Sequence, residues 1–138
     1  MRRTILYIED NPDNMMLIER TIESLGCQML WAANGATGLE MAQTQRPDLI
    51  LLDINLPDID GYEIARRLRA MGENANGQSF LRNVPIIAVT ANALKGDAEK
   101  ALTAGCNAHI PKPISTRELR NRVAAILSQR SPAPASRS

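Results

Sequence analysis

The 138-residue sequence is poor in aromatic residues, with one Phe, one Trp and two Tyr making up 3% of the chain. This scarcity argues against a binding site built on stacked rings, and it means that Ile, Leu, Val, Met and Ala must fill the core. The sequence also lacks an excess of either charge, since 16 basic and 15 acidic residues leave a net charge of +1. Without a long-range positive field, we expect no nucleic-acid partner.

Cysteine is scarce as well. Cys27 and Cys106 lie far apart in the sequence and lack the spacing of metal ligands. We interpret them as two reduced thiols in the core of an intracellular protein. The apolar stretch at residues 4–8 is too short for the core of a signal peptide or for a membrane span. The sequence therefore predicts a cytoplasmic protein with no membrane partner.

Short apolar runs alternate along the chain with segments of helical periodicity. The runs occupy residues 5–8, 29–32, 49–52, 86–89 and 108–110. This alternation is typical of an α/β protein with a parallel sheet, in which strands covered on both faces are almost wholly apolar. We expect a single domain over residues 1–129. Residues 130–138, which read RSPAPASRS, are predicted to form a disordered tail.

Capping residues indicate where the first and last helices begin. Asn11 as N-cap, followed by Pro12 in the first helical position, predicts the start of the first helix, and Gly26 predicts its end. Ser115 and Glu118 have the spacing of a capping box, which predicts a helix after Ser115.

Two further segments have weaker patterns. Residues 95–104 are helical in pattern, but the apolar side carries mainly alanines plus Leu102, so we expect a weakly anchored helix suited to movement. Residues 72–83 are rich in Gly and Asn, and we interpret them as a long loop with Phe80 and Leu81 tucked back.

Polar residues follow four of the five apolar runs. Glu9 and Asp10 follow the first run, Asp53 the third, Thr90 the fourth, and Lys112 comes soon after the fifth. In an open α/β sheet, ligands bind beyond the carboxyl ends of the strands, at a point where the strand order reverses. We therefore expect three acids, a hydroxyl and a lysine to converge at that edge.

Acids gathered at one edge need a counter-ion. Two carboxylates about 5 Å apart repel each other by roughly 3 kcal/mol at an effective dielectric constant near 20. Oxygen ligands with no nearby His or thiolate favour Mg²⁺, or Mn²⁺, over Zn²⁺. Any single acid after a strand is more often a helix cap or a solvated loop residue, but here all the positions would have to coincide. We therefore predict a divalent metal site.

The polar motifs resemble, in order, those of response regulator receiver domains over about residues 4–128. The matching stretches are Glu9-Asp10, DINLPDIDG at 53–61, VTA at 89–91 and Lys112-Pro113. The run EDNPDN at 9–14 is similar to that of single-domain cell-fate regulators and of hybrid-kinase receivers. The resemblance implies a flavodoxin-like (βα)5 fold, a doubly wound parallel five-stranded sheet with strand order 2-1-3-4-5.

The resemblance also implies a set of roles for the site residues. Asp53 would accept a phosphoryl group from a sensor histidine kinase or a phosphotransfer protein. Mg²⁺ would be bound by Asp10, Asp53 and the backbone carbonyl of Asn55, with Glu9 acting through water. Phosphoryl transfer relies on positioning and charge neutralisation, which agrees with such a set of residues.

Lys112 and Thr90 would contact the phosphoryl group itself. Lys112 supplies a point charge, and Thr90 supplies a hydroxyl, although taken alone Thr90 is equally well an ordinary β-branched strand residue. Gly61 is expected to adopt a backbone angle that other residues resist. In the family, the peptide bond that corresponds to Lys112-Pro113 is cis.

One residue departs from the family pattern. Three positions before Lys112, where the family usually has Tyr or Phe, this chain has His109, its only histidine. This residue could be a metal ligand or a phosphorelay histidine, but its strand position favours a packed or switching side chain. In the family the aromatic residue turns inward as the threonine is drawn towards the phosphoryl group, so we expect Thr90 and His109 to form the switch.

These observations predict a response regulator that signals by binding a downstream protein target and is not an enzyme. One alternative is a phosphatase of the haloacid-dehalogenase type, but these enzymes usually carry a second Asp two residues after the nucleophile, where this chain has Asn55. A second alternative is a receiver that binds its partners without phosphorylation. Such a domain normally lacks one of the acids or the lysine, and this sequence has them all.

Overall fold

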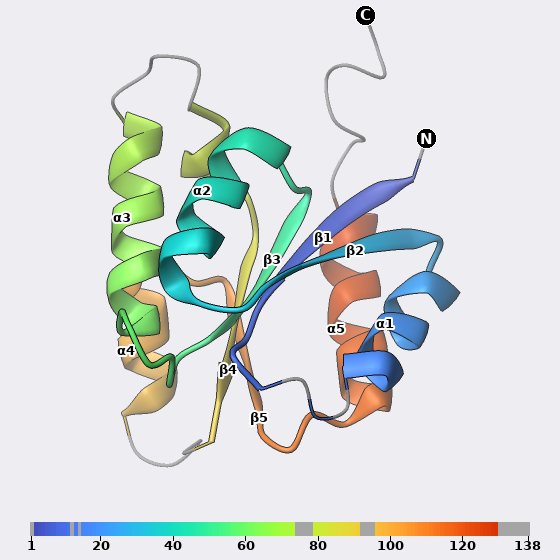
Figure 1. Ribbon diagram of the computed structural model, residues 1–138. Helices are drawn as coiled ribbons and strands as arrows, with labels where there is room; N and C mark the ends of the chain where they lie inside the picture. The colour runs from blue at the N-terminus through green and yellow to red at the C-terminus, as the bar shows by residue number, and fades with distance from the viewer. Residues whose placement is uncertain (1, 12, 14, 74–78, 92–95, 130–138) are drawn as a thin grey trace, which may run out of the picture.

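The computed structural model describes residues 2–11, 13, 15–73, 79–91 and 96–129. The described residues contain a five-stranded parallel sheet with strand order β2-β1-β3-β4-β5 (Figure 1). The strands are β1 (Arg3–Ile8), β2 (Cys27–Ala32), β3 (Leu49–Asp53), β4 (Ile86–Thr90) and β5 (Ala108–Pro111). The helices are α1 (Met15–Ser24), α2 (Gly35–Gln45), α3 (Gly61–Glu73), η1 (Ser79–Arg82), α4 (Asp97–Ala104) and α5 (Thr116–Ser128). The predicted flavodoxin-like fold is confirmed.

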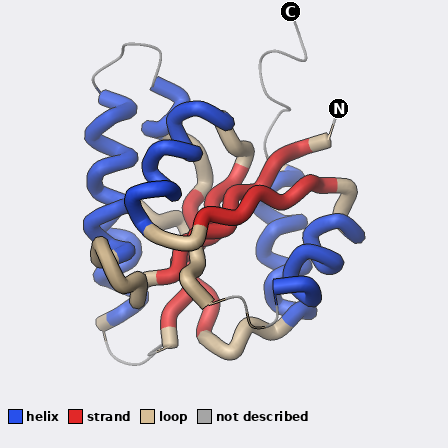
Figure 2. Tube along the Cα trace, viewed as in Figure 1, coloured by secondary structure: helices blue, strands red, loops and turns tan. Residues whose placement is uncertain are grey.

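Helices cover both faces of the sheet (Figures 1 and 2). The α2, α3 and α4 helices pack with Leu6 and Ile8 of β1 in one core, while α1 and α5 pack with Ile5 and Tyr7 in the other. Successive residues of a strand point to opposite faces, so each strand contributes to both cores. All five residues of β3 and all five of β4 are buried, as expected for central strands of a parallel sheet.

The helix caps were predicted with mixed success. The Ser115 side chain accepts a hydrogen bond from the Glu118 N–H (3.2 Å), and α5 begins directly after it, as predicted. The prediction that Asn11 caps α1 was wrong, because its side-chain oxygen accepts from the Asp13 N–H (2.9 Å) and α1 begins only at Met15. Asn11 therefore forms a local turn in the loop before the helix. Pro12 lies outside the described residues.

The α4 helix is shorter than predicted, and the side that it buries differs from the predicted one. It covers Asp97–Ala104, and residues 92–95 lie outside the described part. Ala101 and Ala104 are its buried residues, but Leu102 is 61% exposed, so its assignment to the apolar side was wrong. Residues 101 and 104 lie on one side of a helix, and residue 102 points about 100° away from residue 101.

The predicted loop at 72–83 is partly helical. The α3 helix continues through Gly72 to Glu73, and η1 buries Leu81 completely, with Phe80 partly buried against the same core. A side chain at position 72 would overlap the backbone of Arg82, so the glycine lets η1 pack directly against the helix. Residues 74–78, like the predicted tail at 130–138, lie outside the described residues.

Both cysteines are buried and free, as predicted for core thiols. Burial raises the pKa of the Cys106 thiol to about 11, although the nearby charge of Arg69 acts in the opposite direction. In the described residues, no helix is both long enough and apolar enough to cross a membrane.

Candidate functional site

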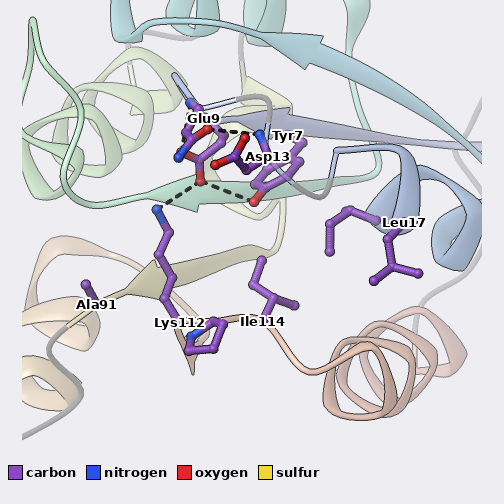
Figure 3. A pocket seen from close by; sticks show the side chains of 10 residues that line it. Tyr7, Glu9, Asp13, Leu17, Ala91, Lys112 and Ile114 are labelled. Carbon is purple, nitrogen blue, oxygen red and sulfur yellow. Dashed lines mark hydrogen bonds and ion pairs between the residues drawn. The ribbon is translucent and has the colours of Figure 1, made fainter.

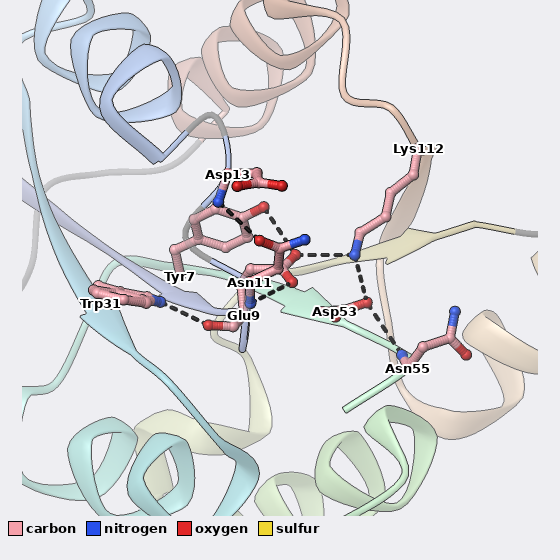
Figure 4. Close-up of polar contacts among 8 residues, drawn as sticks. All are labelled: Tyr7, Glu9, Asn11, Asp13, Trp31, Asp53, Asn55 and Lys112. Atoms are coloured by element: carbon pink, nitrogen blue, oxygen red, sulfur yellow. Dashed lines mark hydrogen bonds and ion pairs between the residues drawn. The ribbon is translucent and has the colours of Figure 1, made fainter. Parts of the chain in front are cut away.

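Several predicted polar residues meet at the carboxyl-terminal edge of the sheet, and Figure 4 shows Glu9, Asp53 and Lys112 among them. Asp53 and Thr90 are the last residues of β3 and β4, which are neighbours in the sheet, and Glu9 and Asp10 follow β1 on the other side of β3. Lys112 follows β5 and reaches back towards β1 and β3. Because all five strands are parallel, their carboxyl ends lie at one edge of the sheet, and residues that are far apart in the sequence meet there.

The three acids form a compact cluster. One carboxylate oxygen from each of Glu9, Asp10 and Asp53 lies within 4.8 Å of the other two. Asp53 is completely buried and Glu9 nearly so, whereas Asp10 is exposed. The cluster is therefore enclosed by protein around Asp53 and open to solvent at Asp10.

Asp53 has one satisfied and one unsatisfied oxygen. Its Oδ1 accepts a hydrogen bond from the Asn55 N–H (3.1 Å) and lies 3.2 Å from Lys112 Nζ. Its Oδ2 is buried without a hydrogen-bond partner among the described residues. An unpaired buried carboxylate oxygen is costly, and a cation beside it would remove that cost. The acids therefore fit a divalent metal ion with oxygen ligands.

Lys112 links the two buried acids. Its Nζ lies 3.0 Å from Glu9 Oε1 as well as 3.2 Å from Asp53 Oδ1. Burial lowers the pKa of Lys112, but the hydrogen bond to Glu9 and the charge of Asp53 outweigh this effect and raise the pKa above its usual value. Burial also raises the pKa of Glu9, and the hydrogen bond with Lys112 only partly offsets it.

Sequence reasoning missed two residues that hold Glu9. The Tyr7 hydroxyl donates to Glu9 Oε1 (3.2 Å), and the Trp31 indole N–H donates to the Glu9 backbone carbonyl (2.7 Å). Tyr7 and Trp31 are paired in register on neighbouring strands. Burial, followed by the charge of Glu9, raises the pKa of Tyr7, so this phenol keeps its proton. The signal in the sequence that could have identified Tyr7 was a phenol within the apolar run before Glu9.

Two residues, Gly61 and Asp58, fix the loop after Asp53. A Cβ at Gly61 would lie 2.5 Å from Ile54 Cα and 2.6 Å from the Asp53 carbonyl oxygen. Gly61 is not among the residues with positive φ, so the predicted reason for this glycine was wrong. The position requires a small residue because α3 begins directly against the end of β3.

Asp58, in the same loop, was also missed. Its carboxylate accepts hydrogen bonds from the N–H groups of Gly35 (2.9 Å) and Ala36 (3.0 Å) at the start of α2. The hydrogen bond from Gly35 is the main cause of the lowered pKa of Asp58. Free N–H groups at a helix start favour such an acceptor, but only the folded chain brings this loop to α2.

The remaining predicted residues lie around the cluster. Thr90 is buried, and its carbonyl accepts a hydrogen bond from the Lys112 N–H (2.8 Å). The Lys112-Pro113 peptide bond is cis, as the family resemblance implied. His109 is partly buried in β5, paired with Ala88, and it belongs to no group of potential metal ligands in the described residues. The Asn55 backbone contacts Asp53 while its side chain is exposed.

A cavity of about 440 Å³ adjoins the cluster (Figure 3). It opens between the segments that follow β1 and β5, so Glu9 and Lys112 form part of its wall. The lining residues are Tyr7, Glu9, Asn11, Asp13, Leu17, Ile18, Ala91, Lys112, Pro113 and Ile114.

Comparison with known proteins identifies the family. The polar-differentiation response regulator DivK of Brucella anthropi is 43% identical over 115 residues, which cover 83% of this chain and 88% of DivK. A receiver domain of the sensor histidine kinase PA1611 from Pseudomonas aeruginosa, solved with magnesium coordinated in its active site cleft, is 42% identical. It has a TM-score of 0.76, and the match covers 91% of this chain and 97% of that one.

A response regulator from Chloroflexus aurantiacus is 27% identical, with a TM-score of 0.82, and covers 93% of this chain and 99% of its own. Residues 5–124 match the response regulator receiver domain as a family. The converging acids, lysine and threonine at the end of a 2-1-3-4-5 sheet agree with these matches. This chain belongs to the response regulator receiver domain family.

Proposed function

We propose that this protein is a phosphorylation-controlled switch of two-component signalling, with Asp53 as the residue that accepts the phosphoryl group. The observation that carries the proposal is the state of the Asp53 carboxylate. It is completely buried, one oxygen faces Lys112 and the Asn55 N–H, and the other has no partner among the described residues. A purely structural acid in this position would be expected to satisfy both oxygens.

The donor is the phosphohistidine of a sensor histidine kinase or of a phosphotransfer protein, or a small phosphodonor. A carboxylate oxygen of Asp53 attacks phosphorus, an O–P bond forms and the P–N bond to the imidazole breaks. The imidazole leaves with the bonding electron pair and takes up a proton, and Asp53 becomes an acyl phosphate. Little covalent chemistry is required of the surrounding residues, so their roles are to position and to stabilise charge.

The metal site follows from the acid cluster. Asp10, Asp53 and the backbone carbonyl of Asn55 would hold Mg²⁺, with Mn²⁺ as an alternative, and Glu9 would act through water. When bound, the ion neutralises charge on the cluster and on the transferred group. The oxygen-only ligand set supports this assignment, as does Asp53 Oδ2, which has no partner among the described residues. The similar receiver domain of PA1611 has magnesium coordinated in its active site cleft.

Lys112 and Thr90 would sense the new phosphoryl group. Lys112 Nζ is already within 3.2 Å of Asp53, so a short movement takes it to a phosphoryl oxygen. Thr90 supplies a hydroxyl at the end of the next strand. Asn55 stands where a haloacid-dehalogenase phosphatase usually carries a second Asp as its general acid. We therefore propose that the protein is not an enzyme acting on outside substrates and that its output is binding to a downstream protein target.

The test is phosphorylation of the full chain by acetyl phosphate in Mg²⁺, followed by intact mass spectrometry. Wild type should gain one phosphoryl group, Asp53→Asn should gain none, and Asp60→Asn, an exposed acid in the same segment, should behave as wild type. Asp10→Asn or excess EDTA should slow the reaction at least tenfold, because the cluster loses its cation or a ligand to it. Labelling of Asp53→Asn equal to that of wild type would exclude Asp53 as the acceptor.

Phosphotransfer from a panel of purified histidine kinases and phosphotransfer proteins would then identify the donor. The cognate donor should transfer to wild type much faster than the other members of the panel, and no member should label Asp53→Asn.

A further inference from the structure

Tyr7 stands out because its hydroxyl has a polar partner inside an apolar core. The side chain is 4% exposed and packs with Ile5, Ile18 and Ile22 between the sheet and helices α1 and α5. A buried hydroxyl costs free energy unless it is hydrogen-bonded. Here the hydroxyl donates to Glu9 Oε1 at 3.2 Å, so a side chain from the core reaches into the acid cluster (Figure 3).

The accepting oxygen is the one that also pairs with Lys112. Glu9 Oε1 receives the Tyr7 hydroxyl and lies 3.0 Å from Lys112 Nζ, while Oε2 accepts from the Asn11 N–H at 3.1 Å. The two oxygens of Glu9 are therefore held by three donors. Of these, Tyr7 is the donor whose side chain is set rigidly by a central strand and a packed core.

The position of Glu9 in turn affects Asp53. Lys112 Nζ lies between the two carboxylates, 3.0 Å from Glu9 and 3.2 Å from Asp53. If Oε1 lost the Tyr7 hydroxyl, Lys112 would be its only donor among the described side chains, and the ammonium group would be drawn towards Glu9. The Glu9 side chain would also gain rotational freedom, and both changes would disturb the cluster beside Asp53.

We propose that Tyr7 is a positioning residue for phosphotransfer: its hydroxyl fixes Glu9, and through Glu9 it sets the placement of Lys112 and the acid cluster around Asp53. The inference rests on the proposed function, since it concerns the same site. It goes further by assigning a role in the reaction to a core residue whose hydroxyl donates to Glu9.

The test is a double-mutant cycle on Mg²⁺ binding, which requires no phosphoryl transfer. Mg²⁺ is titrated into ¹⁵N-labelled protein, and the Asn55 amide, which donates to Asp53 Oδ1, reports binding. Tyr7→Phe should weaken Mg²⁺ binding about fivefold, the effect of losing one hydrogen bond. In the Glu9→Met background, Tyr7→Phe should change the affinity by less than about twofold, because methionine offers the Tyr7 hydroxyl no carboxylate or amide oxygen.

A matched control removes another buried hydroxyl. Thr21 is 4% exposed, and its hydroxyl donates to the Leu17 carbonyl within α1. Thr21→Val should leave Mg²⁺ affinity unchanged. At saturating Mg²⁺, Tyr7→Phe should still reduce the rate of phosphorylation by acetyl phosphate, whereas a packing defect would lower the melting temperature without this reduction.

Fluorine NMR gives a second readout in the protein with an intact Tyr7. The chain has only two tyrosines, Tyr7 and Tyr62, so 3-fluorotyrosine labelling gives two signals, and Tyr62 in α3 is the internal reference. The Tyr7 signal should shift on addition of Mg²⁺ in wild type and shift less in Glu9→Met, which lacks the accepting oxygen.

Unchanged Mg²⁺ affinity in Tyr7→Phe, an equal loss in both backgrounds, or a Tyr7 signal indifferent to Mg²⁺ would each overturn the proposal. If the cycle holds while wild type accepts no phosphoryl group, the proposed function fails but the coupling of Tyr7 to the metal site stands. If wild type is phosphorylated and the cycle fails, the coupling of Tyr7 to the metal site fails but the proposed function stands.

Discussion

Lys112 Nζ lies 3.2 Å from Asp53 Oδ1, so a positive charge stands beside the proposed acceptor carboxylate. The same nitrogen contacts Glu9, and both acids are buried while the lysine side chain is 28% exposed. Lysine therefore stabilises the fold as well as the site, because two neighbouring buried carboxylates without a cation would repel each other.

We predict that Lys112→Met destabilises the metal-free protein by about 2 kcal/mol, since it leaves two buried acids without a counter-charge. Mg²⁺ should restore more stability to this variant than it adds to wild type, because the ion replaces the missing positive charge. Urea unfolding with EDTA and with Mg²⁺ measures both effects. Lys100→Met on the exposed side of α4 is the control and should change neither value; equal Mg²⁺ stabilisation of Lys112→Met and wild type would contradict the prediction.

Arg69 anchors the segments that precede β4 and β5, at the end of these strands opposite the acid cluster. Its guanidinium donates to the carbonyls of Gly105 (2.7 and 3.0 Å), Leu81 (2.8 Å) and Val84 (2.7 Å) and to the side chain of Asn107 (3.0 Å). Arg69→Lys should lower the free energy of unfolding by about 2–4 kcal/mol, because one ammonium group cannot serve these separate acceptors.

Arg67→Lys provides the matched control for this measurement. Arg67 lies in the same helix at the exposed surface, and within the described part of the chain its recorded partner is Glu63. Its replacement should change stability by no more than about 0.5 kcal/mol. Equal urea midpoints for the two variants would show that the Arg69 contacts contribute little.

The Cys106 thiol should make stability depend on pH in alkaline solution. Its pKa is raised from 9.0 to about 11 by burial, so between these values the unfolded chain loses the proton and the folded chain keeps it. The folded state is then disfavoured as pH rises from about 9 to 11, by up to roughly 3 kcal/mol. Stability should be unaffected by this thiol below pH 9, and Cys106→Ala should lose less stability over the alkaline range. Identical profiles of stability against alkaline pH for wild type and Cys106→Ala would contradict this direction of the effect.

The α4 helix, β5 and α5 are predicted to change most on activation. Thr90 ends β4 and Lys112 directly follows β5, and these two strands border this surface. Among the described side chains of α4, those of Ala101 and Ala104 are buried in the core. The N-terminal end of α4 lacks a side-chain cap at Gly96, and its C-terminal end is held by Arg69 through Gly105. Amide exchange with and without beryllofluoride, an analogue of the acyl phosphate, should differ most in these elements.

The role of His109 is tested in the same samples. If the partly buried ring turns inward on activation, its ring-proton signals should shift with beryllofluoride, and the shift should be lost in Thr90→Ala, since the two side chains are expected to move together. Amide-exchange differences confined to residues 18–41 would argue against this output surface. His109 ring signals that do not shift with beryllofluoride would argue against this switch.

The sequence by itself determined the parallel sheet and the convergence of the acids at one edge of it. The central strands read as apolar runs because they are covered on both faces, and each run is followed by a polar residue at a position that a parallel sheet brings to one edge. Glu9, Asp53 and Lys112 could therefore be placed together without any knowledge of distances. The cap at Ser115 was equally predictable, because its hydrogen bond spans only three residues.

Only the tertiary structure decided the features that join segments far apart in the chain. Arg69 contacts Gly105, 36 residues away, and Asp58 caps a helix that begins 23 residues earlier. Leu102 was wrongly assigned because an eight-residue helix that reads DAEKALTA, with three alanines and one leucine, does not define which side will be covered. By sequence, Tyr7 is a phenol in an apolar run and Gly61 is a glycine of the matched motif, and neither fact shows what the residue contacts. Their roles arise from a hydroxyl that reaches Glu9 and from a helix that begins against the end of β3, and local sequence preferences carry no information about such contacts.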